Sequence, residues 1–107
     1  MRIVRKTPAA ERDIEDEYVH LALDSRDAGV RFLQRLDATF AMLAEFPGVG
    51  HVWRSKVRGA RGVRVRTVRG FRKILVLYRR IRGGIEVLRV LHGARDIERI
   101  WESPADE

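Results

Sequence analysis

The most constraining feature of the sequence is a pair of apolar stretches, residues 73–79 and 84–91, separated by a short turn that contains Gly83. Both stretches are rich in Val, Ile and Leu. Apolar, β-branched stretches of this length predict buried strands, and a glycine turn between them predicts an antiparallel hairpin. We therefore expect two buried strands, of which residues 73–79 form the central one, and the rest of the chain adds neighbouring strands and a cover.

The residues before this hairpin predict more strands. In residues 63–67, Val or Thr alternates with Arg64 and Arg66, which predicts a strand with one apolar and one basic face and makes a three-strand meander. Residues 2–6 are a further short strand candidate, and residues 51–60 are interpreted as a loop. Trp53, followed by several basic residues, either packs across the edge of the sheet or offers a base-stacking aromatic ring in a basic patch.

The N-terminal half predicts two helices. Thr7 and Pro8 supply a capping hydroxyl and a proline suited to the first helical position. A second apolar stripe at helical spacing runs over residues 28–46 and ends at the Pro and Gly residues that follow. The carboxylates between residues 11 and 17 are interpreted as the solvated face of the first helix rather than as a metal or acid–base site. We expect an α+β fold, with a helical hairpin on one face of a small, mostly antiparallel sheet and a basic opposite face.

Length and composition limit the classes of protein that remain. A chain of 107 residues fits a single domain, which we place at residues 1–102, with a short helical segment at 96–102 and a disordered acidic tail at 103–107. The absence of cysteine excludes disulfides, a thiol nucleophile and cysteine-based zinc sites, and favours the cytoplasm. No apolar run approaches the ~20 residues of a membrane helix. We expect no metal and no cofactor.

The charges are strongly segregated along the chain. Residues 1–53 hold 7 Lys/Arg and 9 Asp/Glu, whereas residues 54–95 hold 14 Lys/Arg and one acidic residue, a net charge of +13 for that segment. The last twelve residues carry a net charge of −4. A basic block of this size is typical of a surface that binds a polyanion or an acidic protein. A solvated basic surface is the alternative, although a general arginine bias would load both halves of the chain.

Residues 87–96, Val-Leu-Arg-Val-Leu-His-Gly-Ala-Arg-Asp, resemble the C-terminal signature of the RelE/ParE superfamily of bacterial toxins, in its ParE-like, plasmid-stabilisation branch. The helix around Tyr18, the helix exit at 46–50 and the segment 70–78 resemble the same family in matching places. The resemblance implies the same α+β architecture, a cognate ParD-like antitoxin and a toxin–antitoxin hetero-oligomer. The sequence does not indicate which residues bind the antitoxin.

The resemblance implies two alternative activities. A ParE-like toxin inhibits DNA gyrase by trapping its cleaved complex with DNA and performs no chemistry itself. Its target-binding residues here would be the exposed basic side chains Arg64, Arg66, Arg72, Arg95 and His92. A surface of guanidinium groups suits this role because arginine stays charged and is a poor general base.

The alternative is a RelE-like endonuclease that cleaves mRNA on the ribosome, and the same five residues would be its candidate catalytic groups. This reaction needs a base, an acid and positive charge beside the phosphate. Arg64 and Arg66 stand where such nucleases often carry lysine, and Trp101 stands where they carry a tyrosine hydroxyl. These differences favour gyrase inhibition, while His92 is the one side chain suited to proton transfer.

Three further interpretations stay open. His92 is either a functional imidazole or a strand-end side chain that hydrogen-bonds the backbone. Arg89 alternates with apolar neighbours, so we expect it to share a face with Val87 and Leu91 and to be partly buried and paired, whereas Arg95 follows the strand and should be exposed. A plain nucleic-acid-binding domain is a third class of function, but neither predicted helix has the basic surface of a DNA-reading helix.

Overall fold

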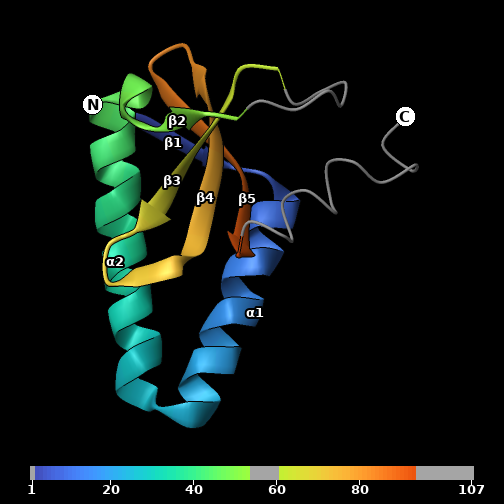
Figure 1. Ribbon diagram of the computed structural model, residues 1–107, viewed down its shortest axis with the longest axis vertical. Coiled ribbons are helices and arrows are strands. Elements are labelled where there is room, and N and C mark those ends of the chain that lie inside the picture. Colours follow the sequence, from blue (N-terminus) through green and yellow to red (C-terminus); the bar gives the residue numbers. More distant parts are fainter. Residues whose placement is uncertain (1, 54–60, 94–107) are drawn as a thin grey trace, which may run out of the picture.

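The computed structural model describes residues 2–53 and 61–93 and has an α+β fold, as predicted. In chain order the elements are β1 (Ile3–Lys6), α1 (Pro8–Asp24), α2 (Arg26–Glu45), the 3₁₀ turn η1 (Pro47–Val49), β2 (His51–Val52), β3 (Val63–Val68), β4 (Phe71–Ile81) and β5 (Gly84–His92). The helices form a hairpin against the sheet, and its tip extends beyond the end of the sheet where β5 finishes (Figure 1).

The five strands form one mixed sheet in the order β1-β5-β4-β3-β2. The meander β3-β4-β5 is antiparallel, which confirms the predicted hairpin, and β1 adds to β5 in parallel. The loop predicted at residues 51–60 is wrong at its start, because His51 and Val52 pair with Val65 and Arg64. Two paired residues are too few to produce an alternation in the sequence.

Ser25 alone connects the two helices. Its backbone N–H donates to the carbonyl of Leu21 and ends α1, while its hydroxyl accepts from the N–H of Ala28 and begins α2. The second helix therefore runs over residues 26–45 rather than the predicted 28–46. So short a connection forces the helices into an antiparallel pair, and a Cβ at Gly29 would lie only 3.0 Å from that of Ala22.

The main core lies between the helices and one face of the sheet. The apolar stripe predicted for α2 is buried there, and Phe32 also meets the ring of Phe71 edge-on at 5.8 Å between centroids. The fully or almost fully buried members of this core on the strands are Val68, Ile74, Val76, Tyr78, Ile85, Val87 and Val90. Burial of this stripe, rather than intrinsic helix propensity, stabilises a hairpin of this kind.

The centre of the opposite face of the sheet is apolar, so the prediction of a wholly basic face is wrong. Val63, Leu77 and Leu91 form a second buried cluster there, with Trp53 and Val65 packed against it. The backbone N–H of Trp53 also donates to the carbonyl of Val63, which supports the packing interpretation of this tryptophan. Within the described part of the chain, its indole N–H is buried without a hydrogen-bond partner.

The register explains why the two arginines of β3 are on the helix side. Arg64 lies opposite Tyr78 and Arg66 opposite Val76, and both of these partners belong to the main core. Directly opposed residues share a face of the sheet. The alternation of apolar and basic residues in β3 was predicted correctly. The sequence of such a strand does not indicate, however, which of its two faces the helices cover.

A β-bulge at Leu88 corrects the prediction for Arg89. Leu77 pairs with Arg89 while Tyr78 pairs with Val87, so one residue of β5 is left over. A bulge of one residue reverses the faces on either side of it. Val87 therefore belongs to the main core and Leu91 to the second cluster, and Arg89 cannot share a face with both.

Several predictions fall outside the described residues. These are Arg95, Trp101, the short helix at 96–102, the domain end at residue 102 and the tail at 103–107. In residues 2–53 and 61–93, neither helix is both long and apolar enough to span a membrane.

Candidate binding surface

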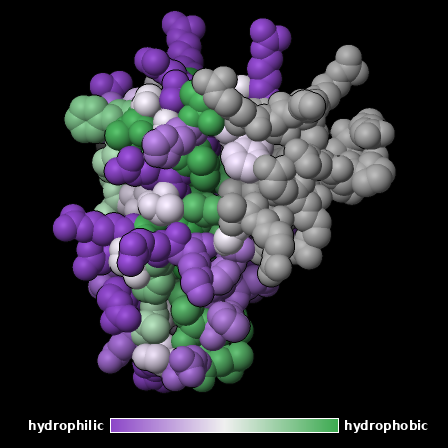
Figure 2. Space-filling view, viewed as in Figure 1, coloured by the Kyte–Doolittle hydropathy of each residue, from purple (hydrophilic) through white to green (hydrophobic). Residues whose placement is uncertain are grey.

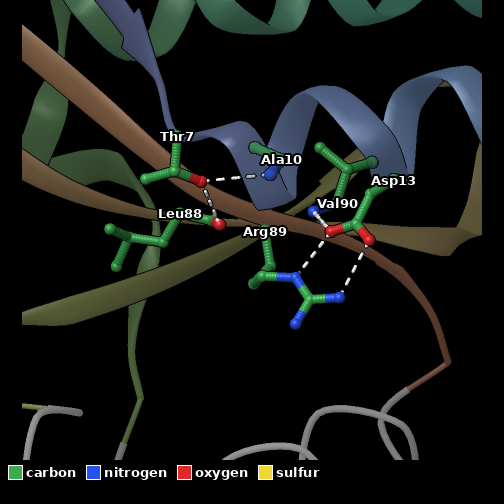
Figure 3. Close-up of polar contacts among 6 residues, drawn as sticks. All are labelled: Thr7, Ala10, Asp13, Leu88, Arg89 and Val90. Atoms are coloured by element: carbon green, nitrogen blue, oxygen red, sulfur yellow. Dashed lines mark hydrogen bonds and ion pairs between the residues drawn. The ribbon is translucent and has the colours of Figure 1, made fainter.

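The first turns of α1 complete the edge of β5 where β1 ends (Figure 3). Thr7 donates its backbone N–H to Val87 and its hydroxyl to the carbonyl of Leu88, at 3.1 and 2.8 Å. The same hydroxyl oxygen accepts from the N–H of Ala10 at 3.0 Å, which confirms Thr7 as the predicted helix cap. An uncovered strand edge pairs readily with other chains, and here the start of a helix protects it.

Asp13 continues this protection one turn further along α1. Its carboxylate accepts from the N–H of Val90 at 3.0 Å and from Nε and Nη2 of Arg89 at 2.7 and 2.8 Å. The side chains are 13% and 26% exposed, and the hydrogen bonds to Asp13 raise the pKa of Arg89. Arg89 is thus paired and half-buried, as predicted. For Asp13, however, the solvated-face interpretation is wrong.

A second polar cluster fixes Arg64. The buried hydroxyl of Tyr78 donates to the carbonyl of Pro47 at 2.7 Å and accepts from the N–H of Gly50 at 2.9 Å. Arg64 donates to the carbonyl of Gly50 at 2.8 Å. Burial raises the pKa of Tyr78, although the Gly50 hydrogen bond and the charges of Arg64 and Arg66 oppose this shift. These contacts give Arg64 a structural role at the exit of α2.

Exposed basic side chains gather where β4 begins and β5 ends. Arg69 lies in the β3–β4 turn, Arg72 and Lys73 begin β4, and His92 ends β5; all four are exposed. We call these four residues the basic end. The N–H of Gly93 donates to the carbonyl of Lys73 at 2.6 Å and ties the two strands together there. In the view of Figure 2, hydrophilic side chains project between areas of apolar surface.

The structure brings together only some of the residues proposed from sequence. His92 lies opposite Ile74, and Arg72 precedes Ile74 by two residues, so both belong to the basic end. Arg64 lies opposite Tyr78, which is four positions further along β4 than Ile74, a distance of about 13 Å along a strand. Arg64 and His92 are therefore too far apart to act on one phosphate.

Arg35 and Arg69 were not singled out by the sequence analysis. Arg35 lies on α2 and Arg69 in the β3–β4 turn, and with Arg66 they line one pocket. Arg31 and Arg35 are four residues apart on α2, which places them on one helix face. That spacing is a signal in the sequence, but nothing in it indicates that this face meets β3.

Comparison with known families decides the identity of the chain. The family model described as "ParE toxin of type II toxin-antitoxin system, parDE" matches residues 4–97, nearly the whole chain. The chain belongs to the ParE toxin family. This assignment agrees with the predicted resemblance and with the helical hairpin, the meander and the C-terminal strand described above.

A solved structure supports the fold of this ParE-family chain. The structure titled "Chromosomal ParDE TA system from P. aeruginosa" superposes with a TM-score of 0.67 over 87% of this chain and 97% of that one. The two sequences are 22% identical, so this likeness concerns the fold alone. No curated protein sequence matches the chain.

Proposed function

We propose that this ParE-family protein inhibits DNA gyrase through its basic end, without performing chemistry itself, and that a ParD-like antitoxin neutralises it. The observation that carries the proposal is the exposed group of Arg69, Arg72, Lys73 and His92 on one end of a rigid sheet. Guanidinium and ammonium groups bind carboxylates and phosphates but make poor general bases at neutral pH. Arg95, which follows β5 in the sequence, is the fifth target-binding residue that we propose.

The distribution of the other arginines supports the same activity. Arg64 is committed to the carbonyl of Gly50, and Arg89 to the carboxylate of Asp13. A nuclease needs an acid and a base on either side of one phosphate. Of the candidates in the described part of the chain, only His92 carries an imidazole, the type of side chain suited to proton transfer. The exposed imidazole of His92, at the same end of the sheet as Arg72, keeps ribosome-dependent mRNA cleavage as the second candidate activity.

Expression in bacterial cells tests the proposal. Induction of the wild-type protein is expected to stop growth, start the SOS response and produce filaments while translation continues at first. Arg72→Ala is expected to fold normally and to lose most of the toxicity, because Arg72 is exposed and has no partner among the described residues. Arg80→Ala, an exposed arginine at the other end of β4, is the matched control and should stay toxic.

Co-expression tests the partner. A ParD-like antitoxin encoded beside the toxin gene is expected to restore growth and to co-purify with the toxin. Immediate arrest of translation without an SOS response, or full growth in the absence of any antitoxin, would contradict the proposed function.

A further inference from the structure

A groove between α2 and β3 combines positive charge with an apolar floor. It has a volume of about 490 Å³ and opens to solvent beside the β3–β4 turn. Arg35, Arg66 and Arg69 line it, and Ala38 and Met42 of α2 add apolar surface to the lining. We call this site the α2–β3 groove.

The three arginines of the groove lack an anionic partner within the described residues. The ion pairs found there join other side chains, Arg2 to Glu45 and Arg89 to Asp13. Arg31, one turn before Arg35 on α2, adds a fourth guanidinium nearby, placed 5.9 Å from the centre of the Phe71 ring. Like charges at close range repel, so the groove is better suited to an anion than to remaining empty.

The shape of a guanidinium and the lining of the groove indicate what kind of anion fits. Guanidinium groups bind planar carboxylates through two parallel hydrogen bonds. The apolar floor at Ala38 and Met42 stabilises a ligand only if the ligand also buries an apolar side chain there. Among residues 2–53 and 61–93, no aromatic side chain lines the groove, so this part of the chain offers no stacking surface there for the bases of a nucleic acid.

We propose that the α2–β3 groove binds an acidic peptide segment of another protein, with an apolar side chain on Ala38 and Met42 and flanking carboxylates on Arg35, Arg66 and Arg69. Such a segment lies beside the basic end without covering all of it, because Arg69 is the one residue that the two surfaces share. That the antitoxin supplies the segment rests on the proposed function.

Charge reversal tests the arginines. The probe is a fluorescein-labelled peptide of 14 residues, built from alternating Glu and Leu pairs, and binding is measured by fluorescence anisotropy in 150 mM salt. Arg35→Glu with Arg69→Glu is expected to weaken binding at least tenfold, because both side chains are exposed and line the groove. Arg80→Glu with Arg82→Glu makes the same change of charge at exposed positions at the other end of β4 and should weaken it less than threefold.

A neutral substitution tests the floor. Ala38→Phe fills the groove without changing the charge and is expected to weaken binding at least tenfold. Ala41→Phe is its control, since Ala41 is also exposed on α2 but does not line the groove. Neither change touches a buried residue, so melting temperatures should stay within a few degrees of the wild type.

Several results would overturn the inference. The first is an equal loss of peptide affinity in the two charge-reversed double variants, and the second is unchanged affinity in Ala38→Phe. The third is a dimer that Ala38→Phe dissociates, which would show that a second copy of the chain occupies the groove. Groove-dependent binding of a single-stranded thymidine oligonucleotide in place of the peptide would also overturn it. A ParD-like antitoxin that binds the toxin but does not displace the peptide refutes the antitoxin as the source. Groove-dependent peptide binding without any antitoxin complex supports the groove and contradicts the proposed function.

Discussion

Asp13→Ala is expected to lower the melting temperature by about 10 °C. This is a larger effect than we expect for Arg89→Ala, which removes the other member of the Asp13–Arg89 ion pair. The substitution leaves the guanidinium of Arg89 and the N–H of Val90 without their acceptor at a partly buried position. Removing one partner of a buried pair costs about 3–5 kcal/mol, and the partial exposure of this pair reduces the expected loss to about 2–4 kcal/mol.

Arg89→Ala should cost less, about 1–2 kcal/mol, because Asp13 still accepts from the N–H of Val90. Asp16→Ala, which removes an exposed carboxylate of the same helix, is the control and should change stability by less than about 0.5 kcal/mol. Thermal and urea unfolding of the three variants provide the measurement. An Asp13→Ala variant as stable as Asp16→Ala would show that the carboxylate does not hold α1 to the edge of β5.

Gly50→Ala is expected to destabilise the protein by about 2–4 kcal/mol, whereas Gly48→Ala should be nearly neutral. A Cβ at Gly50 would lie 2.5 Å from the hydroxyl oxygen of Tyr78 and 2.9 Å from Cε1 of its ring. The ring is fully buried and has no room to retreat, so the chain at residues 47–50 must shift and break both hydrogen bonds of the hydroxyl. A Cβ at Gly48 meets no atom within 4 Å.

A double-mutant cycle separates the clash from other effects of the alanine. Tyr78→Phe removes the oxygen closest to the new Cβ, so Gly50→Ala should cost less in that background than in the wild type. Equal costs in the two backgrounds, or an equal effect of Gly48→Ala, would contradict the role of the Tyr78 hydroxyl in fixing the exit of α2.

Periodic patterns predicted most of the fold. The apolar stripe of residues 28–46, the cap at Thr7 and the two strands around Gly83 all follow from local chemistry, and the structure confirms them. Such patterns are local, because a stripe or an alternation records which residues are buried together along one element.

The predictions that failed depend on contacts between distant segments. Whether Arg64 and Arg66 lie on the helix side of the sheet depends on where α2 packs. The face of the sheet on which Arg89 lies depends on a β-bulge, which an alternating sequence pattern does not reveal. Asp13 lies 76 residues from Arg89, and its neighbours in the sequence include other acids of the same charge. The α2–β3 groove likewise joins α2, which ends at Glu45, to β3, which begins at Val63.

Purified DNA gyrase, with ATP and supercoiled plasmid, tests the central claim most directly. Addition of the toxin is expected to trap cleaved complexes and yield linear DNA after protein removal. Arg72→Ala should lose most of this activity, and His92→Ala should keep it, because the proposed inhibition involves no proton transfer by the toxin. The contradictory result is intact plasmid together with mRNA cut in the A site of ribosomes, with His92→Ala slowing that cleavage by on the order of 10²–10⁴.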